Sequence, residues 1–199
     1  ATRGCPYQCT FCHTALSYYN KLQYSGLDRV KAEVSFFAER LKGRPNLPLY
    51  LADNNFGMFE RDAEITEFIG QMQSKYGWPM TIDTTVGKSQ VKKVAKALKN
   101  LAPRTLQVNA VVQTTTPSVL KTIRRRNLSL TDLDWIKHQT KNQGNRTSSD
   151  LIIGLPGETK DTFFQSIAEV IRAGVNGLSP YTLMNLLGTP LYRPPDDRE

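Results

Sequence analysis

All three cysteines of this 199-residue chain, Cys5, Cys9 and Cys12, lie in one eight-residue window near its beginning. A disulfide framework needs an even number of cysteines and an oxidising compartment, which makes it a poor explanation of three closely spaced cysteines. A structural zinc site usually takes four ligands from paired C-x-x-C halves, and His13 could nominally add the fourth ligand. The third possibility is a four-iron, four-sulfur cluster, whose irons are bound by cysteine thiolates.

The C-x-x-x-C-x-x-C spacing allows one loop to place three thiolates around one iron–sulfur cluster. Three thiolates leave one iron of the cluster without a protein ligand. In an electron carrier this would be a defect, whereas in an enzyme it is an open coordination position for a substrate. The cysteine window therefore favours a catalytic cluster, with zinc as the main alternative.

Composition excludes several other classes of protein. The chain is 39% hydrophobic and 22% charged, which describes a soluble globular protein with a substantial core. No apolar run reaches the length of about 20 residues that spans a bilayer, so we expect no membrane association. The net charge is +8, and basic residues gather at 88–99 and 124–126. Such patches attract nucleic acid or phosphates, but without a nucleic-acid-binding motif a solvated surface or a docking face is favoured.

Helix-like and strand-like segments alternate along the chain. Apolar residues at helical spacing predict helices, and short apolar or β-rich runs between them predict strands. Pro117 suits the first turn of a helix. The predicted helices lie at 27–41, 61–76, 91–101, from 117, near 130–143 and at 163–171, and the predicted strands at 47–53, 79–85, 105–113, within 148–159 and at 177–185.

This alternation predicts an α/β fold with a mostly parallel sheet wrapped by helices. With a first strand before Cys5, which we expect to be truncated, there are six strand–helix units. Polar residues at the strand ends suit a partial (β/α) barrel, although a doubly wound open sheet would show the same alternation. We expect one domain over 1–192, followed by a Pro- and charge-rich linker or tail at 193–199.

The segment "CPYQCTFC" resembles the signature of the radical S-adenosylmethionine (SAM) enzymes, including the aromatic Phe11 before the third cysteine. The resemblance implies that Cys5, Cys9 and Cys12 bind a [4Fe–4S] cluster, whose open iron is chelated by the amino and carboxylate groups of SAM. It implies that an electron from the reduced cluster cleaves SAM to methionine and a 5′-deoxyadenosyl radical. It also implies a partial (β/α) barrel of six units.

Further segments follow the order of the family's motifs. In "LADNNFG", Asp53, Asn54 and Asn55 take the place of a polar element near the SAM amino group, although the glutamate of many relatives is absent. Gln113 and Thr114 match positions near the ribose or methionine moiety. Each of these residues also has an ordinary structural interpretation, because Asx side chains commonly form turns and caps.

The resemblance assigns three more positions. Arg125 takes the place of a basic residue that can meet the SAM carboxylate, and Ile152 and Ile153 match apolar residues that flank the adenine. The segment "LLGTPLY" at 186–192 matches the one that follows the sixth strand. The assigned positions follow predicted strands, where a (β/α) barrel carries its chemistry.

The sequence looks most like the cobalamin-binding branch of the family, which implies methyl transfer or another radical modification with a cobalamin domain outside this chain. A methylthiotransferase acting on tRNA or a peptide epimerase is an alternative within the family. An alternative of a different class is a basic, metal-stabilised nucleic-acid-binding module, which predicts zinc and no affinity for SAM.

The resemblance also implies a reducing, cytoplasmic setting and a one-electron donor such as a flavodoxin or ferredoxin. Because such carriers are usually acidic, the basic face around Lys92, Lys93 and Lys96 is a candidate docking surface for the donor. The substrate, a small molecule or a peptide, is not revealed by the sequence.

Overall fold

The computed structural model describes residues 1–87, 89–106, 108–109, 111–127, 129, 131–132, 135, 138, 144 and 146–193. Most of the helix expected near 130–143, and all but the first residue of the expected tail at 193–199, lie outside these residues. None of the helices in the described part of the chain is long and apolar enough to cross a bilayer.

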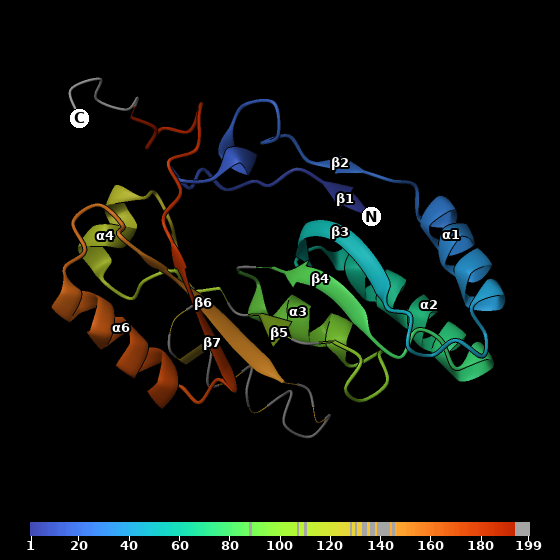
Figure 1. Cartoon of the computed structure of the whole chain (residues 1–199). Helices are drawn as coiled ribbons and strands as arrows, with labels where there is room; N and C mark the ends of the chain where they lie inside the picture. Colours follow the sequence, from blue (N-terminus) through green and yellow to red (C-terminus); the bar gives the residue numbers. More distant parts are fainter. Residues whose placement is uncertain are drawn as a thin grey trace.

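The elements follow the predicted alternation (Figure 1). The strands are β1 (Thr2–Arg3), β2 (Gln23–Tyr24), β3 (Leu49–Phe56), β4 (Ile82–Val86), β5 (Val108–Asn109), β6 (Thr147–Ile153) and β7 (Gly177–Thr182). The helices are the 3-10 helix η1 (His13–Ala15) and the α-helices α1 (Leu27–Arg40), α2 (Glu60–Tyr76), α3 (Val91–Leu98), α4 (Pro117–Thr122) and α6 (Lys160–Arg172).

The parallel strands follow one another in chain order. β3 pairs with β4, β5 with β6, and β6 with β7, all in parallel. A parallel bridge between Ile82 and Leu106 connects β4 to the segment that enters β5. A doubly wound sheet reverses its strand order at a switch point, whereas a (β/α) barrel keeps chain order. The predicted partial barrel is therefore confirmed.

The barrel is not closed. β1 pairs antiparallel with β2 instead of joining a parallel ladder, and β7 pairs with β6 alone in the described residues. The strand expected over 105–113 is shorter than predicted, with β5 at Val108–Asn109 and a further bridge from Gln113 to Leu151. Gln113, beyond the end of β5, has a φ of 71°, a left-handed conformation that a regular strand does not contain.

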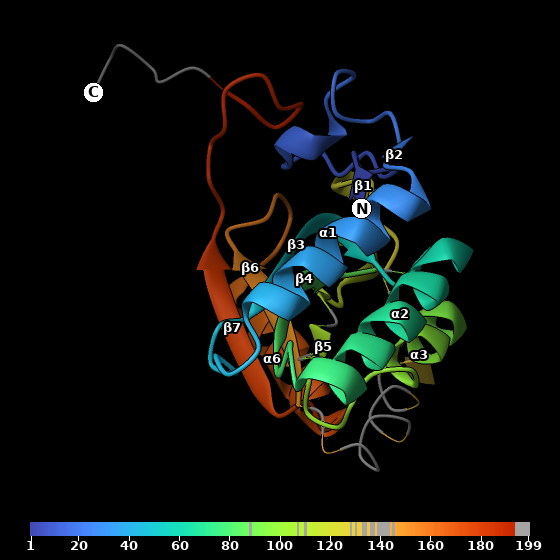
Figure 2. The same ribbon diagram turned by 90° about the vertical axis from the view of Figure 1, so that its right-hand side faces the viewer.

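The core lies between the strands and the helices that cover their outer face. Side chains of a strand point alternately to its two faces, so Leu49 and Leu51 of β3 are buried, whereas Tyr50 and Ala52 are exposed on the inner face. α1 packs against α2 and α2 against α3 (Figure 2), and their apolar stripes, with Ile65 among them, cover the buried face. Burial of each such side chain stabilises the fold by about 1.5–3 kcal/mol.

Candidate active site

The cysteine loop follows β1 and lies close to the carboxyl ends of the strands (Figure 1). The backbone of Thr10, between the second and third cysteines, is bound on both sides. Its N–H donates to the carbonyl of Ile123 at 3.0 Å, and its carbonyl accepts from the N–H of Leu191 at 3.1 Å. The loop is therefore fixed between the end of α4 and the segment after β7.

Two further contacts shape the start of this loop. Gly4 has a φ of 90°, and a Cβ atom there would lie 2.2 Å from the carbonyl oxygen of Lys21, so only glycine fits. The side-chain amide of Asn20 donates to the carbonyls of Cys5 at 2.8 Å and Tyr7 at 3.1 Å. These contacts hold the backbone of the loop in a fixed shape before any ligand binds.

The three cysteines are free thiols. Cys5 and Cys9 are buried, Cys12 is half-buried, and the sulfur of Cys12 lies 3.0 Å from the hydroxyl of Thr14. In the described part of the chain, no three His, Cys, Asp or Glu side chains converge closely enough to hold one metal ion. His13 instead places Nε2 2.8 Å from the carbonyl of Leu187. A structural zinc site would need four ligands around one ion, whereas a four-iron cluster attaches its thiolates to different irons.

Two polar side chains from distant parts of the sequence contact the cysteine sulfurs. Asn55 Nδ2 donates to Cys5 Sγ at 3.3 Å, and Arg125 Nη1 donates to Cys9 Sγ at 3.8 Å. Both Asn55 and Arg125 are buried. Hydrogen bonds to the sulfurs are among the contacts by which proteins tune iron–sulfur clusters.

Local backbone structure explains why Asn55 and Arg125 reach the loop. Asn55 is the penultimate residue of β3, beyond a register shift between Leu51 and Phe56 that changes which face the side chains occupy. Arg125 follows the end of α4, where the left-handed residue Arg124 turns the chain back.

The end of α4 has the two hydrogen bonds of a Schellman motif. The N–H of Arg124 donates to Lys121 O at 3.2 Å, and the N–H of Arg125 donates to Leu120 O at 2.9 Å. The Arg125 guanidinium also donates to the carbonyl of Val111 and, at 3.0 Å, to Asn127.

Three consecutive residues of β3 have three different environments. Asp53 accepts from the backbone nitrogens of Ala1 at 2.7 Å and Thr2 at 2.6 Å, so it holds β1 beside β3. Asn54 lines a cavity of about 660 Å³ together with Tyr18 and other residues of the loop. Of the three, Asn55 is the residue that contacts a cysteine sulfur.

Gln113 and Thr114 differ in the hydrogen bonds of their side chains. The backbone of Gln113 bridges to β6, and its side-chain Oε1 is buried and has no hydrogen-bond partner among the described residues. Thr114 is buried, donates to Glu158 Oε1 at 2.6 Å and accepts from the N–H of Thr116 at 3.1 Å. Thr114 thus belongs to a hydrogen-bond network that includes Ser166 of α6.

Of the apolar residues that the resemblance assigns, Phe11 and Ile152 lie together in the structure, whereas Ile153 does not join them. Phe11 packs against a small cluster that contains Ile152, Ile123 and Leu155. Ile152 is buried within this cluster, whereas Ile153 is 43% exposed. The cluster therefore connects the loop residue before Cys12 to the end of β6, without Ile153.

Sequence reasoning missed several residues that shape the site. Asn20 lies outside every motif, and its contacts to the loop carbonyls have no sequence signal. Tyr7 is inside the cysteine window, where its ring places the hydroxyl 2.5 Å from Ser89 Oγ and 3.1 Å from Met58 Sδ. Glu158 is assigned no role by the sequence motifs, although its carboxylate accepts a hydrogen bond from Thr114.

The family model of the radical SAM superfamily matches residues 1–170. The chain therefore belongs to the radical SAM superfamily and is an enzyme of that class, which decides against the nucleic-acid-binding module. Enzymes of this class use a [4Fe–4S] cluster and SAM as cofactors.

The proteins to which this chain is similar include two methyltransferases. It is 28% identical over 195 residues to the cobalamin-dependent radical SAM methyltransferase TokK of Streptomyces tokunonensis, covering 96% of this chain and 28% of TokK. It is 28% identical over 174 residues to the 2-(S-pantetheinyl)-carbapenam-3-carboxylate methyltransferase of Streptantibioticus cattleyicolor, covering 86% of this chain and 25% of that enzyme. The chain thus spans about a quarter of the length of these curated relatives.

The fold is also that of the radical S-adenosylmethionine methyltransferase TsrM from Kitasatospora setae, whose structure holds cobalamin and a [4Fe–4S] cluster. The TM-score is 0.72 at 16% sequence identity, covering 95% of this chain and 37% of TsrM. At this identity the likeness concerns the fold.

Proposed function

We propose that residues 1–192 form the core of a radical SAM enzyme in which Cys5, Cys9 and Cys12 bind the [4Fe–4S] cluster. The observation that carries this proposal is that Asn55 and Arg125 donate to the sulfurs of Cys5 and Cys9. In such a cluster Cys5 and Cys9 would be the ligands of the irons. Asn55 and Arg125 would be outer-shell residues that donate hydrogen bonds to the ligand sulfurs.

The charge of the site also fits an anionic cluster. Arg125 is 7% exposed and forms no ion pair with a carboxylate among the residues that the structure describes. A buried charge without a counter-charge is strongly unfavourable. Deprotonated cysteines supply negative charge next to this guanidinium, because metal-binding cysteines are thiolates.

Two buried polar atoms of the candidate residues fit SAM as well. Asn55 Oδ1 and Gln113 Oε1 are buried and have no partner among the described residues. We assign Asn55 Oδ1 as an acceptor for the SAM amino group, Arg125 as the cation for its carboxylate, and Gln113 as an acceptor for a hydroxyl of the ribose. An unpartnered buried oxygen is costly, and a ligand donor at each atom would remove that cost.

The reduced cluster, when bound, supplies the electron that cleaves SAM to methionine and a 5′-deoxyadenosyl radical. The residues of this chain orient SAM and exclude water from it. Phe11 and Ile152 present an apolar surface that suits the adenine, and Asp53 acts indirectly, by holding β1 and the loop beside β3. Exclusion of water protects a reactive species from side reactions.

The reaction that follows is proposed from the relatives. TokK is named as a cobalamin-dependent methyltransferase, and the second relative is named as a methyltransferase. We therefore propose radical-based methyl transfer, with cobalamin bound by a domain outside these 199 residues. The electron donor is proposed to be a flavodoxin or ferredoxin.

The test is anaerobic iron–sulfur reconstitution followed by electron paramagnetic resonance (EPR) with and without SAM. We expect about four irons per chain and a reduced-cluster signal that shifts when SAM is added. Substitution of Cys5, Cys9 or Cys12 by Ala should abolish the cluster and SAM cleavage. His13→Ala is the matched control in the same loop and should keep its iron.

Full SAM cleavage in any single-cysteine variant would overturn the cluster assignment. Zinc in place of iron, lost together with His13, would restore the structural zinc site. A cluster whose EPR signal is indifferent to SAM would make the cysteines an electron-transfer site and remove the proposed catalytic role.

A further inference from the structure

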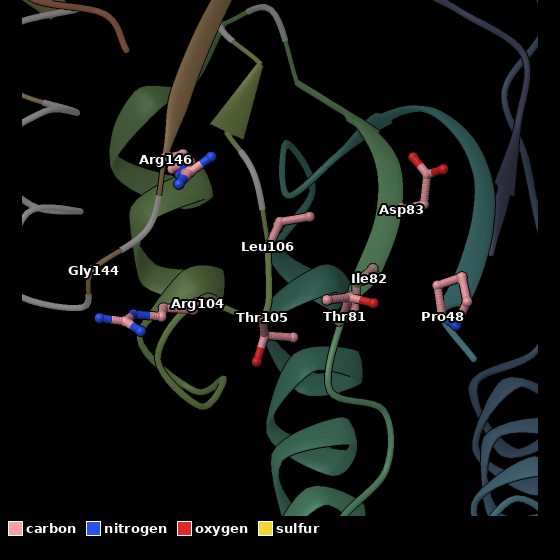
Figure 3. Close-up of a pocket in the computed structure, with 9 residues that line it drawn as sticks. All are labelled: Pro48, Thr81, Ile82, Asp83, Arg104, Thr105, Leu106, Gly144 and Arg146. Carbon is pink, nitrogen blue, oxygen red and sulfur yellow. The ribbon is translucent and has the colours of Figure 1, made fainter. Parts of the chain in front are cut away.

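A cavity of about 760 Å³ lies at the end of the sheet opposite to the cysteine loop. Its walls include Thr81 and Arg146, which directly precede β4 and β6, and Thr105, in the segment that leads into β5, whereas Asn55 is near the carboxyl end of β3. Figure 3 shows Arg146 and Asp83 on opposite sides of the view, with Thr105 and Thr81 between them on the segments that lead into β5 and β4. Its volume is in the range of sites for small molecules.

The cavity carries charged side chains that have no partner. Within the described residues, the guanidinium groups of Arg104 and Arg146 form no ion pair or side-chain hydrogen bond, and neither does the carboxylate of Asp83. Two arginines at one cavity provide several N–H donors in planar arrays that match the oxygens of a carboxylate or phosphate.

Arg104 lines the cavity from a strained backbone position. Arg104 has a φ of 65°, which is uncommon for a residue with a Cβ atom and costs about 1–2 kcal/mol. Gly144 leaves room for this side chain, because a Cβ atom at Gly144 would lie 3.1 Å from Arg104 Nε. Strain at a non-glycine residue persists where the surrounding structure imposes it, often at binding sites.

The cavity continues along the inner face of the barrel toward the cysteine loop. Asp83 also lines a second cavity of about 280 Å³, together with Asn54 and Asn109. Asn54 in turn lines the third cavity, of about 660 Å³, beside Arg3 and Tyr18. Successive cavities that share residues form one polar surface from the base of the strands to the loop.

The length of this surface follows from the strands. β4 has five residues from Ile82 to Val86, and a rise of about 3.3 Å per residue makes the surface on the order of 15 Å long. A molecule that contacts both ends must be elongated. The inner face is accessible to it because the barrel is not closed.

We propose that the inner face binds an elongated substrate, whose anionic group is held by Arg104 and Arg146 while its reacting part lies beside the cysteine loop. The anionic group is a carboxylate or a phosphate, and Asp83 accepts a hydrogen bond from a donor farther along the molecule. The role of this site in substrate binding rests on the proposed function, whereas its affinity for an anion does not.

The test is a calorimetric titration of the cluster-loaded protein with inorganic phosphate and, separately, with acetate at constant ionic strength. We expect saturable binding of one of the two anions at a single site, and the tighter anion identifies the chemical group. Arg104→Gln and Arg146→Gln should each weaken this binding, and the double variant should weaken it by about tenfold or more. Arg172→Gln, at the exposed end of α6, removes the same charge away from the cavity and should leave binding unchanged.

Equal loss of affinity in Arg172→Gln would mean that the anion responds to net charge only, and the site would be rejected. Absence of saturable binding by both anions would also overturn it. The EPR signal of the same samples with SAM reports separately on the cluster. If the anion binds but the EPR signal of the cluster does not respond to SAM, the proposed function is rejected. If the EPR signal responds to SAM but no anion binds, only the anion site is rejected.

Discussion

The side-chain amide of Asn55 donates to the sulfur of Cys5 at 3.3 Å, although the two residues are 50 positions apart in the chain. The end of β3 brings the amide to the loop, and the loop brings the thiol to the carboxyl end of the sheet. The other atom of the amide, Oδ1, is buried and has no partner among the described residues. One side chain therefore presents a donor to the thiol and an unused acceptor for a ligand.

Substitution of Asn55 by Ala should leave about four irons per chain and lower the reduction potential of the cluster. A hydrogen bond to a thiolate stabilises the reduced, more negative cluster, and its loss is worth about 1 kcal/mol. For a one-electron couple this corresponds to about 40 mV. Affinity for SAM should also fall, because the acceptor Oδ1 is lost. EPR-monitored redox titration and SAM titration measure both effects.

Asn54→Ala is the matched control, since it removes the same side chain from the neighbouring residue, which lines a cavity and contacts no cysteine sulfur. It should change the potential little. An unchanged potential in Asn55→Ala, or an equal change in both variants, would contradict the assigned contact.

Arg125→Ala should reduce SAM affinity more strongly than Asn55→Ala. Hydrogen bonds to charged groups are worth about 1.5–3 kcal/mol, which predicts a loss of affinity of about tenfold to a hundredfold. Iron content should be retained, because Arg125 contacts Cys9 without being a candidate ligand. Anaerobic titration of the reconstituted variant with SAM measures the effect.

Arg126→Ala removes an exposed arginine from the next position and should leave the affinity for SAM near that of the native protein. If the two arginine variants lost affinity equally, the effect would come from net charge and Arg125 would have no specific role.

Much of the fold could be predicted from the sequence because its helices and strands carry clear periodicity. The apolar stripe from Leu27 to Leu41 became α1, and the buried run at 47–53 became most of β3. The β-rich run at 105–113 was misleading in its length, because within the described residues it forms only β5 at Val108–Asn109 and isolated bridges at Leu106 and Gln113. The left-handed conformation of Gln113 is not revealed by local propensity. Strand order required the structure, since both α/β architectures share the same alternation.

The candidate site could be predicted in part. Spacing predicted the three cysteines as ligands, and the resemblance predicted roles for Asn55 and Arg125, which the structure places against Cys5 and Cys9. Their binding of the cluster and of SAM stays a prediction. The anchoring contacts of Asn20 could not be predicted, because they depend on tertiary proximity and not on any local pattern.

Replacement of Lys92, Lys93 and Lys96 by Glu should slow reduction of the cluster by a flavodoxin by about tenfold or more at low salt. In the structure, Lys93 and Lys96 both pair with Glu60, at 3.2 and 3.8 Å. Because one carboxylate serves two lysines, the face of α3 keeps a net positive charge. α3 begins two residues after Ser89, which contacts the cysteine loop through Tyr7. A donor bound to α3 would therefore be close to the cluster.

Reduction by dithionite should be unaffected in this variant, and higher salt should diminish the difference with flavodoxin. The matched control replaces Arg40, Lys42 and Arg44 with Glu, which makes the same charge change at the exposed end of α1. Equal slowing in the control would contradict a docking surface at α3, and so would a normal rate in the α3 variant.

Asp62→Ala should lower the free energy of unfolding by about 1–3 kcal/mol, which urea denaturation measures. Asp62 is fully buried at the start of α2 and accepts from the N–H groups of Gly57 at 2.9 Å and Phe59 at 3.0 Å. Its carboxylate thereby closes the turn that follows Asn55. Asp62→Asn keeps an acceptor for both N–H groups and should be destabilised much less.

The pH dependence separates the charge of Asp62 from its hydrogen bonds. Burial raises the pKa of Asp62 above the ordinary aspartate value, although the two N–H donors oppose this shift. The folded state therefore binds the proton more tightly than the unfolded chain does, so the free energy of unfolding falls as the pH rises through the raised pKa. Asp62→Asn lacks this titration. The stability of the native protein relative to this variant should therefore decrease between the ordinary aspartate pKa and the raised pKa of Asp62, and become constant at higher pH. A relative stability that rises with pH would show that hydrogen bonding to the carboxylate outweighs its desolvation.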